Sequence, residues 1–279
     1  MKADTFSLAR DIVQGKWLVA YPEKLLPIAR AFLSKASLEM EVRPSEVLSI
    51  LDPDVAETGA KRIAVIPLHG TMTKYDTCES MGTLFIAKQL KEAADDDSVV
   101  GVVLDIDSGG GSSSAVPPML EAIRLCRAAG KKVFAHVDGC GSAAYWVASQ
   151  CDAVYMDNPL SEVGSIGSMA ILVDDTAPDP QTGEKLVVVY ARESKDKNLS
   201  YREALKGNYD PVMDELSPLV KQFQDDVING RPGLKKDADG VLTGRMFLPD
   251  EAVRLGMADA VHTLSETVEA LFAISEMNP

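Results

Sequence analysis

The chain has 279 residues, of which 46% are hydrophobic and 25% charged, and its formal net charge at pH 7 is −14. This composition is typical of a globular protein with a sizeable core, and the length allows one large domain or two small ones. The acidic balance argues against a nucleic-acid partner, because phosphates require a basic face, and against adhesion to anionic membranes.

Residues 1–60 are expected to be a helical N-terminal extension and linker. The segment EKLLPIARAFLSKA has apolar residues at roughly helical spacing, and a polar, turn-rich stretch follows it. The apolar run over residues 17–21 is too short for a signal peptide or a membrane anchor. We therefore expect a cytoplasmic protein without a membrane anchor.

From Lys61 onward the pattern changes to alternating strands and helices. We expect strands over 62–70, 98–107, 131–138 and 151–157, and helices over 81–96, over 115–130 and directly after Ser142. The run over 98–107 is almost wholly apolar, which is typical of a strand buried on both faces. Alternating elements predict right-handed βαβ units and a mostly parallel sheet, so residues 61–279 are interpreted as an α/β core.

Three glycine-rich turns follow predicted strands: DSGGGSSS over 107–114, DGCGSAA over 138–144 and EVGSIGSM over 162–169. Functional groups of parallel sheets gather at the carboxyl ends of strands, so these turns are expected to meet. The first turn has neither the lysine of a P-loop nor the GxGxxG pattern. It remains open as a phosphate cradle, a plain tight turn or an oxyanion hole that stabilises negative charge on a carbonyl oxygen.

Ser142 is either a helix N-cap or a nucleophile. It does not lie in a GxSxG elbow, because Cys140 and Ala144 occupy the glycine positions. Cys140 could itself be a nucleophile, but small buried cysteines are usually inert. The four cysteines show neither a CxxC pair nor metal-ligand spacing, which favours reduced thiols: Cys78, Cys126, Cys140 and Cys151.

A nucleophilic serine needs a base. Nothing in the spacing favours any of the three histidines, which are His69, His136 and His262, and His136 is expected to pack within a strand. A desolvated lysine can serve instead, because burial favours its neutral amine. The lysines after Ser142 that the pattern leaves open are Lys185, Lys195, Lys197, Lys206, Lys221, Lys235 and Lys236.

Six segments, in this order, resemble the signal peptide peptidase A (protease IV) serine proteases, and most closely their phage-type capsid-assembly branch. They are VIPLHGTM, GVVLDIDSGGG, GSAAYWVAS, VGSIGSM, VVVYARESKDKNLS and GVLTGRMFLPDEAVRLGMADAV. Each segment alone is weak, but together they cover most of residues 61–262 in the family's order. The resemblance implies the Clp-protease/crotonase fold and a Ser/Lys dyad.

Carried over by position, the resemblance makes Ser142 the nucleophile and Lys195 the general base. The backbone N–H groups of Gly110 and Ala143 would form the oxyanion hole, and Ser165 would orient the lysine. No metal and no cofactor are expected, and residues 237–242 lack most ligands of a calcium loop.

The resemblance also implies a site for an extended peptide that adds as a strand. The residues expected to bind it are Gly109, Gly111, Gly164, Ile166 and Gly167. Gly109 stands where the family has a proline, so this turn should be less stiff. The sequence SKDKNLS also departs from that of many phage relatives, which leaves Lys197 as an alternative base.

Relatives of this kind assemble into rings or domes in which neighbouring subunits supply the serine and the lysine. The resemblance therefore implies a homo-oligomeric serine endopeptidase acting on extended or unfolded peptide segments, with phage capsid maturation as one setting. Two alternatives remain: a catalytically inactive peptide-binding scaffold of the same fold, and a crotonase-type acyl-CoA enzyme. The latter should have cleft carboxylates and an adenine-nucleotide site, and neither is evident.

Overall fold

The computed structural model describes residues 17–19, 61–77, 80–172, 174, 176–178, 182–185 and 187–277. The helical extension predicted over residues 1–60 therefore lies outside the described residues, apart from strand β1 (Trp17–Val19). These three residues form a strand, so the helical prediction is wrong for them. Cys78 also lies outside the described part of the chain.

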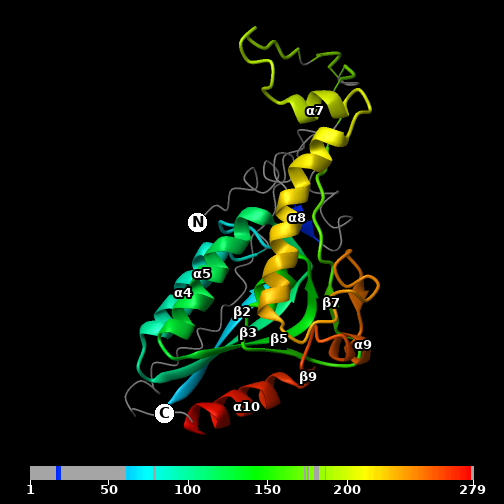
Figure 1. Ribbon diagram of the computed structural model, residues 1–279. Coiled ribbons are helices and arrows are strands. Elements are labelled where there is room, and N and C mark those ends of the chain that lie inside the picture. The colour runs from blue at the N-terminus through cyan, green and yellow to red at the C-terminus, as the bar shows by residue number, and fades with distance from the viewer. Residues whose placement is uncertain are drawn as a thin grey trace.

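A mostly parallel sheet forms the centre of the molecule, as predicted (Figure 1). Its strands run in the order β2-β3-β5-β6-β9, and every pair along this path is parallel. The bounds are β2 (Arg62–His69), β3 (Val99–Ser108), β5 (Lys132–Gly141), β6 (Ala153–Met156) and β9 (Ala260–Val261). Beyond β6, β7 (Glu162–Gly164) pairs with the end of β5, and β8 (Met246–Phe247) pairs antiparallel with β7.

Helices cover both faces of the sheet, which explains why the sequence of β3 is apolar at nearly every position. Helices α4 (Thr83–Asp95), α5 (Val116–Ala128) and α6 (Ala143–Ser149) bury their apolar residues in the core cluster on one face. Helix α10 (Leu264–Met277) packs on the opposite face of the sheet (Figure 1). There Leu271 packs with Val103 and Phe134. The left-handed conformation of Gly130 (φ 77°) follows the end of α5, as expected for a glycine stop.

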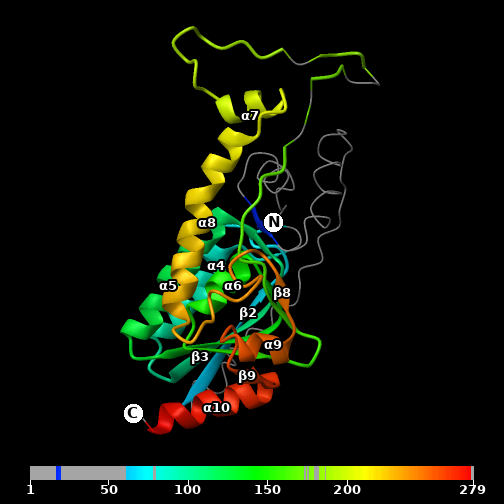
Figure 2. The ribbon, with the colours of Figure 1, turned by 45° about the vertical axis from the view of Figure 1, so that its right-hand side comes forward.

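A long arm projects from this core. Helix α8 (Asp210–Gly230) is anchored at its C-terminal half, where Phe223 is buried and stacks on Trp146 with ring centroids 4.7 Å apart. Trp146 Nε1 also donates a hydrogen bond to Asp226 Oδ2 at 2.9 Å. In both views the other end of α8, together with α7 (Leu199–Ala204), extends away from the sheet (Figures 1 and 2). Helix α9 (Pro249–Arg254) packs beside β7 and β9.

None of the helices within the described residues is both long and apolar enough to cross a membrane.

Candidate active site

The three glycine turns meet at the carboxyl end of the sheet, as predicted from their positions after strands. Ser108 of β3 pairs with Cys140 of β5, and Gly141 of β5 pairs with Gly164 of β7. Because the paired strands end together, the turns that follow them lie side by side. The middle turn carries Ser142.

Ser142 lies between β5 and α6 in a strained backbone conformation, with φ 56° and ψ −118°. It is 1% exposed, and its N–H donates to the carbonyl oxygen of Gly164 at 2.8 Å. Its hydroxyl makes no capping bond to the residues of α6, all of which the structure describes, and its Oγ points instead to the Gly167 carbonyl oxygen at 3.4 Å. A positive φ costs a non-glycine residue about 1–3 kcal/mol and is concentrated at functional sites. The geometry therefore does not fit an ordinary N-cap.

The two expected oxyanion donors differ in whether their N–H groups already have a hydrogen-bond acceptor. Ala143 is the first residue of α6, where helical N–H groups have no acceptor within the helix. The N–H of Gly110 donates to Ser108 Oγ at 3.1 Å, and that hydroxyl donates to the Gly70 carbonyl oxygen at 2.6 Å. An oxyanion here would therefore have to compete with Ser108 Oγ for the Gly110 N–H.

Two expected peptide-binding glycines are held by close backbone approaches. A Cβ on Gly111, in the short strand β4 (Gly110–Ser112), would lie 2.0 Å from the carbonyl oxygen of Met72. A Cβ on Gly164, whose φ is 136°, would lie 2.3 Å from the carbonyl oxygen of Arg245. These distances exclude any side chain, so both positions can offer only backbone groups to a peptide.

The other expected binding residues occupy different surroundings. Ile166 is 1% exposed and belongs to the core, so its side chain is not available to line a cleft. Ser165 is half-buried with φ 54°, and its N–H donates to Arg245. Gly109 is half-buried, and a Cβ on Gly167 would meet nothing within 4 Å among the described residues.

Cys140 is not a candidate nucleophile. The residue is completely buried, and burial raises the pKa of its thiol well above the ordinary value. The thiol therefore stays protonated, and a protonated thiol is a poor nucleophile. This confirms the prediction of an inert core cysteine.

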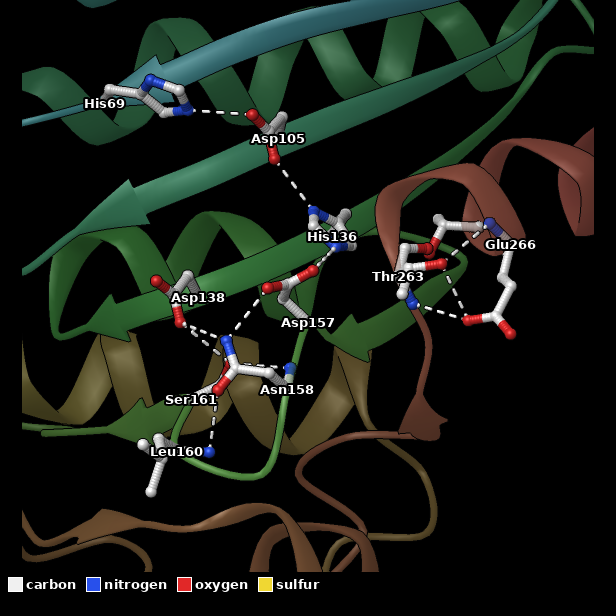
Figure 3. A network of polar contacts seen from close by, with 11 residues as sticks. His69, Asp105, His136, Asp138, Asp157, Asn158, Leu160, Ser161, Thr263 and Glu266 are labelled. Atoms are coloured by element: carbon white, nitrogen blue, oxygen red, sulfur yellow. Dashed lines mark hydrogen bonds and ion pairs between the residues drawn. The ribbon is translucent and has the colours of Figure 1, made fainter.

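Two histidines belong to a separate polar network (Figure 3). His69 Nε2 lies 2.9 Å from Asp105 Oδ2, and His136 Nδ1 lies 2.9 Å from Asp105 Oδ1. His136 Nε2 lies 3.1 Å from Asp157 Oδ1. Burial alone would raise the pKa of Asp105, but the hydrogen bonds to His136 and His69 hold it well below its usual range. Burial opposes the charge on His136, yet Asp105 and Asp157 raise its pKa, and the hydrogen bond to Asp105 also raises that of His69.

This network lies on the face of the sheet opposite Ser142. Phe134, on the same side of β5 as His136, packs with Leu271 of α10. Ala135 and Val137 point the other way, into the cluster that contains α6. The third histidine of the sequence, His262, stacks on Tyr155 of β6. The geometry thus gives Ser142 no histidine base.

The lysines proposed as the base do not reach Ser142 within the described part of one chain. Lys195 and Lys197 are exposed, and the carbonyl oxygen of Lys195 accepts a hydrogen bond from the guanidinium of Arg202 in α7. Helix α7 and the segment before it lie at the far end of α8 from the sheet (Figures 1 and 2). A lysine amine that acts as the base for Ser142 would therefore have to come from outside this single chain.

Sequence reasoning missed the residues that hold the site in place. Ser108 supports Gly110, and Tyr145 of α6 donates from its hydroxyl to the carbonyl oxygen of Met257 at 2.9 Å. A serine directly before three glycines was the available signal for Ser108. The described residues contain no group of three or more His, Cys, Asp or Glu side chains able to hold a metal ion.

Comparisons with known proteins agree with these features. The sequence model of peptidase family S49 matches residues 126–277. Protease 4 of Haemophilus influenzae is 27% identical over 213 residues, which is 74% of this chain and 34% of that protein. The head-tail preconnector protein GP5 of Enterobacteria phage P21 is 27% identical over 223 residues, which is 75% of this chain and 42% of that protein. The chain thus spans less than half the length of these curated relatives.

The solved structures that match this chain share little sequence with it. A serine-to-alanine mutant of the 1510-N membrane-bound stomatin-specific protease has a TM-score of 0.39 and 15% identity, covering 75% of this chain and 84% of that one. A probable enoyl-CoA hydratase/isomerase from Mycobacterium abscessus has a TM-score of 0.43 and 14% identity, covering 77% of this chain and 71% of that one.

Proposed function

The chain belongs to peptidase family S49, and from that premise we propose that it is a serine endopeptidase with Ser142 as the nucleophile. The observation that carries the proposal is the strained, buried Ser142 at the meeting point of three glycine turns. Its Oγ attacks the carbonyl carbon of an extended peptide. The N–H groups of Ala143 and Gly110 stabilise the resulting oxyanion, the latter by exchanging Ser108 Oγ for the substrate oxygen.

The general base in this proposal is Lys195 from a second copy of the chain, oriented by Ser165. His69 and His136 are hydrogen-bonded to Asp105 and His262 stacks on Tyr155, whereas Lys195 is exposed on the projecting arm. The arm also exposes Val187, Val188 and Val189 to 73%, 58% and 86%. Exposed apolar runs of this kind favour burial against a partner, so we propose a homo-oligomeric ring or dome with active sites between subunits.

The substrate class in this proposal is an extended or unfolded protein segment, because the site offers mainly backbone groups at Gly111 and Gly164. A phage relative named for the head-tail preconnector favours particle maturation in the cytoplasm as the setting.

Mixing two inactive variants tests the shared site. Ser142→Ala and Lys195→Ala should each lose hydrolysis of unfolded casein, and a mixture that has exchanged subunits should recover it in roughly a quarter of its sites. Lys197→Ala is the matched control and should stay active. Full activity of Ser142→Ala would exclude this nucleophile, and an inactive mixture with proven subunit exchange would exclude sharing. Loss of activity in Lys197→Ala but not in Lys195→Ala would identify Lys197 as the base.

A further inference from the structure

The helix that follows Ser142 is joined directly to the projecting arm. The backbone N–H of Trp146 in α6 donates to the carbonyl oxygen of Ser142 at 2.9 Å. The indole Nε1 of the same residue donates to Asp226 Oδ2 of α8 at 2.9 Å, and its ring stacks on Phe223 of α8 with an interplanar angle of 8°. One side chain therefore connects the backbone of the proposed nucleophile to the base of the arm.

Two further contacts hold these helices close together. Gln150 Nε2, directly after α6, donates to the backbone carbonyl oxygen of Asp226 at 2.8 Å. At the last residue of α8, a Cβ on Gly230 would lie 2.2 Å from the carbonyl oxygen of Ser149 in α6. Asp226 thus accepts two hydrogen bonds across the contact, one through its side chain and one through its backbone.

Of the two helices, α6 is the one that the core holds in place. All seven residues of α6 are buried, and Tyr145 also donates from its hydroxyl to the carbonyl oxygen of Met257. The structure describes every residue of α8, and among them only Phe223 and Val227 are buried. A weaker contact should therefore move α8 and leave the helix of the nucleophile where it is.

Helix α8 turns a small change at this contact into a larger one at its far end. The helix continues through Pro218, and at about 1.5 Å per residue the stretch from Asp226 back to Asp210 is roughly 24 Å long, so a tilt of about 5° moves that end by about 2 Å. Helix α7 packs on α8, and its Arg202 donates to the carbonyl oxygen of Lys195. A catalytic group misplaced by about 1 Å can cost about 10²-fold in rate.

We propose that the contact between Trp146 and Asp226 positions the arm, so that Lys195 reaches Ser142 of a neighbouring subunit. This inference rests on the proposed shared active site. Both are positioning residues, because they act through the lysine that the arm carries. Loss of the contact in one subunit should therefore impair the site of its neighbour and spare the site that its own Ser142 forms.

Subunit mixtures locate the effect. In an exchanged mixture of Ser142→Ala and Lys195→Ala chains, the first chain supplies the lysine and the second supplies the serine. Adding Asp226→Ala to the lysine-supplying chain should lower kcat for fluorescently labelled casein at least about tenfold, with KM changed less than about twofold. Adding it to the serine-supplying chain should leave kcat within about twofold of the parent mixture.

Three variants of the lysine-supplying chain check the cause. Trp146→Phe keeps a ring against Phe223 and removes the N–H, so it should lower kcat as Asp226→Ala does. Asp226→Asn keeps an oxygen that accepts the indole N–H and should retain most of the kcat. Gln222→Ala is the matched control: this exposed side chain donates to Asp226 Oδ1 at 2.8 Å within α8, and its loss leaves the contact with α6 intact.

Native mass spectrometry should show equal subunit exchange in all mixtures. Equal losses of kcat in the two placements of Asp226→Ala would overturn the positioning role and show that the contact only supports the fold. An unchanged kcat with Asp226→Ala in the lysine-supplying chain would also overturn it. Both results leave the shared site standing, because the parent mixture is then active. An inactive parent mixture with proven exchange overturns the shared site and this inference with it.

Discussion

Replacing Ser142 by glycine should stabilise the folded protein although it removes the proposed nucleophile. Ser142 has φ 56° and ψ −118°, and this conformation costs a serine about 1–3 kcal/mol. Glycine adopts it freely but loses about 0.5–1 kcal/mol through its more mobile unfolded state. The Ser142 Oγ to Gly167 oxygen distance of 3.4 Å is long for a hydroxyl hydrogen bond, so its loss should cost little.

The strain released exceeds the entropic cost of glycine, so Ser142→Gly should raise the free energy of unfolding by about 0.5–2 kcal/mol over the wild type. Ser142→Ala keeps the strain and removes only the hydroxyl, so it should stay within about 0.5 kcal/mol of the wild type. An ordinary N-cap behaves differently, because replacing it with alanine costs about 1 kcal/mol and replacing it with glycine gives no gain.

Urea denaturation of the three proteins at one protein concentration measures these differences, provided that the slopes agree. A Ser142→Ala variant about 1 kcal/mol less stable than the wild type, together with a Ser142→Gly variant no more stable than it, would refute the argument from strain.

Three further predictions concern the histidine network, the glycine strand and the anchor of α8. Asp105→Asn should lower the free energy of unfolding by about 1–3 kcal/mol near pH 5–6, because it removes the charged, half-buried partner of the buried His136. Because the pKa of His136 is raised in the folded protein, the pair with Asp105 contributes its full stability below the unfolded pKa of about 6.5 and loses it as the pH rises through the folded pKa. The difference in unfolding free energy between the wild type and Asp105→Asn should therefore shrink toward pH 8. A difference that widens toward pH 8 would contradict this. Gly111→Ala should lower the free energy of unfolding by about 1–3 kcal/mol and abolish most of the peptidase activity, because its Cβ would lie 2.0 Å from a backbone oxygen. The control Gly167→Ala should change the free energy of unfolding by less than about 1 kcal/mol. Equal losses for the two variants in urea denaturation would contradict this. Phe223→Ala should destabilise the protein by about 3–5 kcal/mol, because the buried ring anchors α8, and a loss under 1 kcal/mol in the same assay would show that this anchor is dispensable.

The alternating core was predictable from the sequence because its signals are local. The apolar run of β3 and the glycine that stops α5 each specify their own element, and the three glycine turns identified the end of the sheet where Ser142 lies. Strand β5 was predicted to end at residue 138 but continues to Gly141. Its glycine-rich end is typical of a turn, and only pairing with β3 and β7 makes it a strand.

Other features depend on contacts that one sequence does not specify. Helix α8 was not predicted; it buries Phe223 and Val227 at one end, and most of its length is exposed or half-buried. Strand β1 exists only through its pairing with β4, so a short apolar run in a helix-like segment gave no sign of it. The exposed position of Lys195 could not be predicted either, because it depends on the arm, which holds this lysine away from Ser142 of the same chain (Figure 1).

Covalent labelling with a fluorophosphonate serine probe, followed by mass-spectrometric mapping of the modified peptide, tests the nucleophile most directly. We predict a single adduct on Ser142 in the wild type and none in Ser142→Ala. An adduct on another residue, or equal labelling of the two proteins, would contradict the account.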